Sequence, residues 1–240
     1  MTPFTLVMAY YDNPSMLFHQ ISKWTALPPE IREALHVIVV DDGSPRWPAL
    51  GVATRVGGWA DDIADFQLFR MKQDVPWNQD ACRNLGVKHA QTAWVLLTDM
   101  DHVVPVNTWR RLMAGRLEKH KVYRFARCTA PDMLAYKPHP NSWALRSKTF
   151  WTCGGYDEAL AGNYGTDGDF MVRLRRVAPF VELSEQLIRY PRDVIPDAST
   201  TTLERKSAEQ KAKVHALLRA RRDVPDWKPR TLSFDFERVL

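Results

Sequence analysis

Three acidic motifs in the sequence could together hold a divalent cation and act on a charged substrate. Asp41-Asp42 and Asp99-Met100-Asp101 each follow a short apolar run, and Asp167 follows a glycine-rich stretch. Carboxylates repel each other by roughly 1 kcal/mol at 4 Å in water, and by more at lower dielectric, unless a cation or hydrogen-bond donors offset their charge. Mg²⁺ and Mn²⁺ prefer oxygen ligands, and Mg²⁺ often takes one or two carboxylates plus substrate phosphates. Each motif alone is typical of a solvated turn, so the prediction of a metal-diphosphate site rests on the set.

The elements predicted around these motifs alternate between strands and helices in the first half of the chain. Short apolar runs indicate the strands, and helices of about 10–15 residues between them are typical of parallel βαβ units. In such open sheets ligands bind outside the carboxyl ends of the strands, where both aspartate motifs of the first half would lie. The predicted strands cover residues 4–10, 35–40, 66–71 and 93–98, and the predicted helices cover residues 14–24, 78–90 and 106–117.

The second half is less regular. Strands are predicted over residues 122–127 and 143–147. A helix is predicted over residues 167–176, with Thr166 as N-cap and Asp169 as the acidic third residue of a capping box. A second box at residues 201–204 predicts a long helix that ends near residue 222, followed by an irregular tail. Asn13, which precedes Pro14, is expected to cap the first helix.

The composition is that of an ordinary globular protein. The chain has 240 residues, of which 45% are hydrophobic, enough for one substantial core, so one domain is the default. No apolar run approaches the ~20 residues that span a bilayer. The N-terminus lacks the basic start of a signal peptide, so a cytoplasmic location is expected. The three cysteines lie far apart, which argues against a zinc site or disulfides, and the net charge of +5 suits an anionic partner.

Six segments occur in an order that is found in one large family of transferases. They are residues 7–14 (VMAYYDNP), 39–44 (VVDDGS), 81–86 (ACRNLG), 96–101 (LLTDMD), 154–158 (GGYDE) and 167–174 (DGDFMVRL). With this set, the sequence resembles glycosyltransferase family two, whose members are inverting nucleotide-sugar transferases with the GT-A fold. The resemblance covers roughly residues 4–176. It implies an α/β fold in which a Rossmann-like, mostly parallel central sheet is flanked by helices and carries a smaller acceptor-side portion.

The resemblance also implies which residues bind the donor, which by default is a UDP-sugar. Tyr11 would stack on the base, Asp42 would accept a hydrogen bond from the base ring, and Ala9 would approach it through its backbone. Arg83 would support the diphosphate or the aspartate cluster, and Met100 is counted among the donor-binding residues.

The remaining implied roles concern the metal and the reaction. Asp101 would be the direct ligand of Mn²⁺ or Mg²⁺, Asp99 would lie near the donor ribose or in the metal shell, and Asp167 would be the general base. The implied division is a GT-A domain over residues 1–200, with a donor half up to about 105 and an acceptor half after it. Residues 201–240 would form a basic helix and tail packed on the same domain. The histidines weighed as further metal ligands, against the plainer interpretation as loop or surface residues, are His102, His139 and His215.

Plainer structural roles stay open for several of these residues. Tyr11 could be an aromatic residue at the edge of the core, and Arg83 could be an ion-pair partner that holds the acidic turn. Asp169 is expected to cap its helix, which leaves Asp167 as the base. The family often has a glutamate where this chain has Thr166, so the contacts with the acceptor stay open.

The acceptor itself is not determined by the sequence. Basic residues gather in the helix predicted to end near residue 222 and again over residues 116–127. A solvated helix face explains them most simply, but they would also suit nucleic acid, with a hydroxylated DNA base as acceptor, or an anionic membrane surface. A saccharide or a lipid-linked sugar is a further alternative. Two other classes are weighed: a nucleotidyltransferase, which should show a glycine-rich phosphate loop after the first strand, and an inactive sugar-nucleotide-binding domain.

Overall fold

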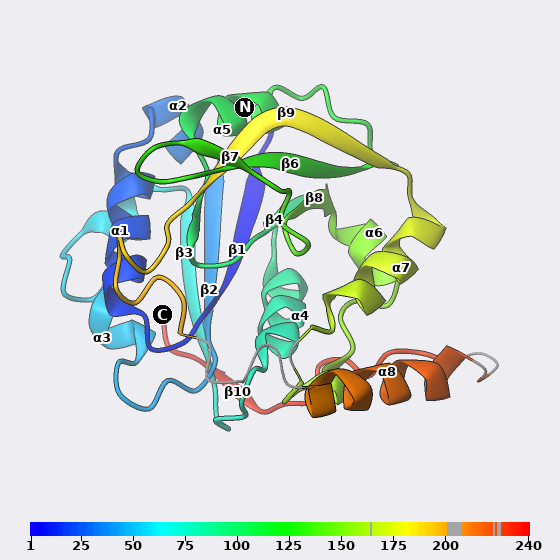
Figure 1. Ribbon diagram of the computed structural model, residues 1–240. Coiled ribbons are helices and arrows are strands. Elements are labelled where there is room, and N and C mark those ends of the chain that lie inside the picture. The colour runs from blue at the N-terminus through cyan, green and yellow to red at the C-terminus, as the bar shows by residue number, and fades with distance from the viewer. Residues whose placement is uncertain (164, 201–207, 223, 225–226) are drawn as a thin grey trace.

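A ten-stranded mixed sheet forms the centre of the computed structural model (Figure 1), which describes all residues except 164, 201–207, 223 and 225–226. The strand order is β10-β3-β2-β1-β4-β8-β6-β9-β5, with β7 paired to β6. Four neighbouring strands are parallel, so their carboxyl ends meet at one edge of the sheet. These are the four strands predicted from apolar runs, namely β1 (Phe4–Tyr10), β2 (Leu35–Asp41), β3 (Asp65–Met71) and β4 (Trp94–Leu97).

Strands from the second half of the chain extend the sheet beyond β4. β8 runs antiparallel to β4, and β6 pairs antiparallel with β8 and parallel with β9. β9 was not predicted, because only Leu183 and Leu187 of its ten residues are buried and no apolar alternation marks it. These strands are β5 (His102–Val103), β6 (Val122–Thr129), β7 (Leu134–Tyr136), β8 (Trp143–Arg146), β9 (Phe180–Arg189) and β10 (Phe236–Arg238).

Helices cover both faces of the sheet because successive side chains of a strand point to opposite faces. Leu6 and Met8 of β1 pack in one cluster with α1 and α5, whereas Val7 between them packs with α4 on the other face. Figure 1 shows α1 and α3 on one side of the sheet and α4, α6 and α7 on the other. The α-helices are α1 (Pro14–Thr25), α2 (Pro29–Arg32), α3 (Ala49–Ala53), α4 (Gln79–His89), α5 (Val106–Met113), α6 (Ser147–Thr152), α7 (Asp167–Val177) and α8 (Ala208–Arg222). Two 3₁₀-helices span Trp59–Asp62 and Glu158–Leu160.

The prediction that the Asn13 side chain caps α1 is wrong. Its side-chain oxygen instead accepts a hydrogen bond from the backbone N–H of Tyr11 at 3.2 Å. The first N–H groups of α1 are bound by Asp197, whose carboxylate accepts from Ser15 at 2.7 Å and from Met16 at 3.0 Å. A carboxylate distant in the sequence therefore supplies the negative charge that a helix N-terminus favours.

The capping box predicted for α7 does not form either. The Thr166 side chain makes no cap hydrogen bond and donates to Asp80 Oδ2 at 3.4 Å. Asp169 accepts from the guanidinium of Arg173 one turn later, at 2.7 and 2.9 Å. The helix nevertheless begins at Asp167 as predicted.

The C-terminal tail is partly regular, contrary to the prediction. β10 pairs antiparallel with β3, and the buried carboxylate of Glu158 holds the chain that leads to it. Its oxygens accept from the N–H of Leu232 at 2.6 Å and from the N–H and the hydroxyl of Ser233, both at 2.7 Å. The second predicted capping box, at residues 201–204, lies outside the described residues. No helix in the described part of the chain is long and apolar enough to cross a bilayer.

Gly86 allows α4 to pack directly against β1, and its replacement by alanine is expected to destabilise the protein. A Cβ atom at this position would lie 2.3 Å from Cγ1 of Val7. We expect Gly86→Ala to cost about 1–3 kcal/mol, the range for overpacking in a close-packed core. Urea unfolding would measure the loss. In a Val7→Ala background the same change should cost less, because the clashing methyl group is gone, and an equal cost in both backgrounds would contradict the explanation.

Candidate functional site

A cavity of about 370 Å³ opens at the carboxyl edge of the parallel strands. The end of β1, the residues after β2 and the residues after β4 form one part of its wall, and α7 and the loop before β8 contribute another. All of the residues predicted for the site line it except Arg83, which lies fully buried behind it. The predicted residues in its wall are Ala9, Tyr11, Asp42, Asp99, Met100, Asp101 and Asp167.

Asp42 contributes a buried carboxylate to one end of the cavity wall. Its side chain is buried, and Oδ2 accepts a hydrogen bond from the Asn78 N–H at 3.1 Å. Oδ1 has no N–H or O–H donor among the described residues, and the nearby Cys82 thiol is a weak donor. Burial raises the pKa of Asp42 well above its ordinary value. The Asp42 carboxylate is therefore enclosed at the wall of the cavity, held by one backbone N–H and in contact with a weakly donating thiol. Tyr11 lines the same end, and its hydroxyl donates to Asp74 at 3.2 Å.

Asp99 lies in the cavity wall between the guanidinium of Arg83 and the imidazole of His139. The guanidinium of Arg83 forms an ion pair with its Oδ1, and Nε2 of His139 lies 3.2 Å from its Oδ2. Burial would raise the pKa of Asp99, but His139 and Arg83 outweigh burial and hold the pKa below its usual range. The predicted ion-pair role of Arg83 is therefore present in the structure, where Arg83 fixes the orientation of the Asp99 carboxylate.

Asp101 is oriented by His102. Nδ1 of His102 lies 2.6 Å from Asp101 Oδ1, and Nε2 of the same ring lies 3.0 Å from Nη1 of Arg127. A guanidinium only donates, so Nε2 must accept and the proton of the neutral ring sits on Nδ1. Burial lowers the pKa of His102, which agrees with a neutral ring. Both ring nitrogens are thus engaged within the protein. His102 holds Asp101 in place and has no nitrogen left for a metal.

Asp167 receives a hydrogen bond from a buried amide. Asn141 donates through Nδ2 to Asp167 Oδ1, and its own Oδ1 accepts from the Tyr156 hydroxyl at 3.2 Å. The guanidinium carbon of Arg83 lies 5.2 Å from the centre of the Tyr156 ring. This contact links the surroundings of Asp167 to the Arg83–Asp99 ion pair.

Asp80 lies beneath Asp167, and Asp80→Asn is expected to flatten the dependence of stability on pH. Burial raises the pKa of Asp80 from 3.8 to about 7. Between these values the folded protein keeps a proton that the unfolded chain releases, so the wild type loses stability as pH rises through this window. Asparagine takes no charge, so we expect the variant to be more stable than the wild type above pH 7 by on the order of 2–4 kcal/mol. Urea unfolding at several pH values across the window would measure the two slopes, and equal slopes would refute the explanation.

Several residues of the cavity wall were not predicted as site residues. Lys137, Asn141 and Arg189 come from the loop before β8 and from the unpredicted strand β9, and no local pattern marks them. The sequence marked Arg127 only as one of the basic residues over 116–127. It marked His139 only as one of three histidines weighed as metal ligands. His215 lies on the exposed surface of α8 and is not part of the wall.

The donor groups present suit a divalent cation that a ligand helps to hold. Within the described part of the chain, no three His, Cys, Asp or Glu side chains are placed to hold a metal ion by themselves. Asp99 and Asp101 present two carboxylates to the cavity, and His139 lies beside Asp99. Mg²⁺ commonly uses one or two carboxylates and completes its shell with substrate phosphates and water. The residues therefore fit a metal that binds together with a diphosphate.

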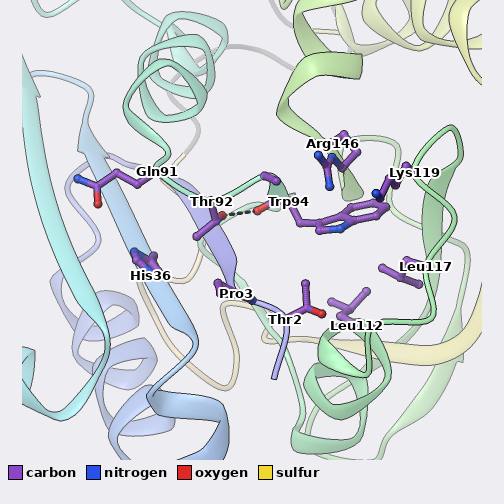
Figure 2. A pocket seen from close by; sticks show the side chains of 12 residues that line it. Thr2, Pro3, His36, Gln91, Thr92, Trp94, Leu112, Leu117, Lys119 and Arg146 are labelled. Carbon is purple, nitrogen blue, oxygen red and sulfur yellow. Dashed lines mark hydrogen bonds between the residues drawn. The ribbon is translucent and has the colours of Figure 1, made fainter.

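A larger cavity of about 500 Å³ lies at the opposite, amino edge of the sheet (Figure 2). It contains none of the predicted site residues and no carboxylate. The guanidinium of Arg146 lies over the Trp94 ring at 5.6 Å, and Lys119 is on the same side. Of these two cavities only the one at the carboxyl edge is lined by carboxylates, so the larger volume does not identify the site here.

Comparisons with known proteins agree with this arrangement. The model of the family described as glycosyl transferase family 2 matches residues 17–152. A crystal structure of S. aureus TarS, residues 1–349, in complex with UDP-GlcNAc superposes with a TM-score of 0.71 at 14% identity, over 95% of this chain and 68% of that one. A crystal structure of GalNAc-T7 with UDP, GalNAc and Mn²⁺ gives a TM-score of 0.61 at 13% identity, over 80% of this chain and 44% of that one. No sequence among the curated proteins matches. These structural likenesses confirm the predicted GT-A fold.

Proposed function

The chain belongs to glycosyl transferase family 2, and from this premise we propose that it moves a sugar from a nucleoside diphosphate to an acceptor hydroxyl with inversion at the anomeric carbon. One observation carries the proposal: Asp42, Asp101 and Asp167, which are far apart in the sequence, line a single cavity at the carboxyl edge of the sheet. That edge is where open α/β sheets bind their ligands.

The donor is proposed to be a UDP-sugar, with its base at the Asp42 end of the cavity. The Asp42 carboxylate would accept a hydrogen bond from the N–H of the uracil ring, and the Tyr11 ring would stack on the base. The TarS and GalNAc-T7 structures named above hold UDP-GlcNAc and UDP. Those ligands belong to these proteins and support UDP as the first nucleotide to test.

Asp101 and Asp99 are proposed to hold Mn²⁺ or Mg²⁺ at the diphosphate. When bound, the metal supplies Lewis-acid stabilisation of the negative charge that develops on the leaving diphosphate. His102 and Arg83 keep the two carboxylates in fixed positions before the donor arrives. Preorganised ligands of this kind lose little freedom when the metal and donor bind.

Asp167 is proposed as the general base. It would take the proton of the acceptor hydroxyl as that oxygen attacks the anomeric carbon, while the bond between this carbon and the diphosphate oxygen breaks. The new glycosidic bond forms on the opposite face of the sugar, and the nucleoside diphosphate leaves with the electron pair. The Asn141 amide donates a hydrogen bond to Asp167 and so fixes the orientation of its carboxylate in the cavity wall.

The proposal is tested by incubating the protein with MnCl₂ and a panel of nucleotide sugars and recording the slow release of nucleoside diphosphate to water. We expect release from a UDP-sugar, its loss on adding EDTA, and its recovery with excess Mn²⁺. Release of pyrophosphate from a nucleoside triphosphate and a sugar phosphate would instead identify a nucleotidyltransferase. Donor binding without release, with every acceptor tried, would identify an inactive sugar-nucleotide-binding domain.

A further inference from the structure

Tyr156 is a buried tyrosine whose hydroxyl is two hydrogen bonds away from the proposed base. The residue is 1% exposed, and its hydroxyl donates to Oδ1 of Asn141 at 3.2 Å. Burial raises the pKa of Tyr156 above its usual range, so the hydroxyl keeps its proton and remains a donor. Tyr156 does not line the cavity at the carboxyl edge. Any effect of this residue on the reaction must therefore pass through its neighbours.

The Asn141 amide is held at both of its polar ends. Its Nδ2 donates to Oδ1 of Asp167, and its Oδ1 accepts from the Tyr156 hydroxyl. An ionised carboxylate only accepts hydrogen bonds, so the amide must present its NH₂ group to Asp167. Asn141 is buried, and without the Tyr156 hydroxyl the amide oxygen would lose this donor. The amide could then rotate, and the Asp167 carboxylate with it.

Tyr156 is itself held by α4 and α7. The Asn84 side chain pairs with its backbone, accepting from the Tyr156 N–H at 2.8 Å and donating to the Tyr156 carbonyl at 2.8 Å. The Tyr156 ring stacks on Phe170, with the ring centres 3.9 Å apart and the planes 15° from parallel. Phe170 lies in α7, three residues after Asp167. The ring therefore packs on the same helix that carries the proposed base.

We propose that Tyr156 is a positioning residue for the general base: its hydroxyl locks the Asn141 amide, and the locked amide holds the Asp167 carboxylate where it takes the proton of the acceptor. This inference rests on the function proposed above. The Tyr156 ring makes a second, separate contact, because the guanidinium carbon of Arg83 lies 5.2 Å from the ring centre. A phenylalanine would keep that contact and lose only the hydroxyl. Removing the hydroxyl should therefore slow the chemical step and leave the binding of metal and nucleotide as it was.

The test uses the full chain with Mn²⁺ and the UDP-sugar that is hydrolysed fastest in the panel described above. Initial rates of UDP release to water, over a range of donor concentrations, would give kcat and KM, and calorimetry would give the Kd of UDP with Mn²⁺. We expect Tyr156→Phe to lower kcat about tenfold, since a hydrogen bond of ordinary strength corresponds to about that factor in rate. KM and the Kd of UDP should stay within about threefold of the wild type, because no group that binds the donor changes.

A double-mutant cycle tests whether the hydroxyl acts through the amide. In an Asn141→Ala background, Tyr156→Phe should have no further effect on kcat, because the amide that the hydroxyl holds is absent. An equal loss of kcat in both backgrounds would show that the hydroxyl does not act through Asn141. An unchanged kcat for Tyr156→Phe in the wild-type background would overturn the proposal outright, as would a higher KM with kcat unchanged.

Tyr123→Phe is the matched control for a loss of stability. Tyr123 is also buried, its hydroxyl accepts from the backbone N–H of Glu118 at 2.7 Å, and it does not line the cavity at the carboxyl edge. This variant should unfold at a lower urea concentration than the wild type and keep its kcat. An equal loss of kcat in Tyr123→Phe and Tyr156→Phe would assign the effect to stability and overturn the positioning role.

Failure of the proposed function gives a different result. If the wild type releases no nucleoside diphosphate from any donor, the transferase proposal fails and the role of Tyr156 fails with it. If the wild type is active and Asp167→Asn keeps the wild-type rate, Asp167 is not the base and Tyr156 has no base to position. A wild type that is active, slowed by Asp167→Asn and unaffected by Tyr156→Phe would leave the proposed function intact and remove only this inference.

Discussion

Asp101→Asn is expected to lower the rate of sugar transfer by about 10³-fold or more, because metal stabilisation of the leaving diphosphate is worth several kcal/mol and each 1.36 kcal/mol is tenfold in rate. The amide keeps an oxygen that can accept from His102 Nδ1, so the local structure should survive. It removes the charge that holds the cation. Release of UDP from the donor would report the rate, and calorimetry with and without Mn²⁺ would show that metal no longer improves donor binding.

Asp132→Asn is a suitable control for this experiment. Asp132 is exposed in the turn between β6 and β7 and does not line the cavity, although the change of charge is the same. Its rate and metal dependence should match those of the wild type. Normal turnover by Asp101→Asn would remove Asp101 from the metal site, and Asp99 would then be the carboxylate to change next.

Asp167→Asn is expected to slow transfer by about 10²–10⁴-fold, the usual contribution of a general base. Donor affinity should stay within about threefold of the wild type, since no metal ligand or base-binding residue changes. The new amide oxygen can still accept from Asn141, so the geometry around it should persist. Initial rates with a saturating donor, together with the Kd of UDP, would separate a loss of chemistry from a loss of binding.

The matched control lies two residues further along the same helix. Asp169 forms an ion pair with Arg173, and its carboxylate does not line the cavity. Asp169→Asn should therefore keep most of the transfer rate, with at most a small loss of stability from an ion pair of one helical turn. If Asp169→Asn lost activity and Asp167→Asn did not, the two roles would have to be exchanged.

The sequence alone predicted what depends on local pattern. The apolar runs of β1 to β4 and the turn residues after them are short-range features, so the strand ends that carry Asp42, Asp99 and Asp101 could be located from them. Gly86 was part of a recognisable motif, but its reason is tertiary, since α4 approaches β1 too closely there for a Cβ atom. Strands β9 and β10 escaped prediction because neither shows apolar alternation: β9 buries only two of its ten residues, and all three residues of β10 are exposed.

Only the tertiary structure decided which distant side chains meet. It placed Asn141 on Asp167, Arg127 behind His102, and Asp197 at the start of α1. Hydrogen bonds and ion pairs between elements follow from how sheet and helices pack, and such polar contacts leave no periodic pattern in the sequence. Asp42, Asp99 and Asp101 could be predicted as a set because the ends of parallel strands fix their positions, and Asp167 because it begins a helix. The groups that orient Asp101 and Asp167 became visible only once the chain had folded.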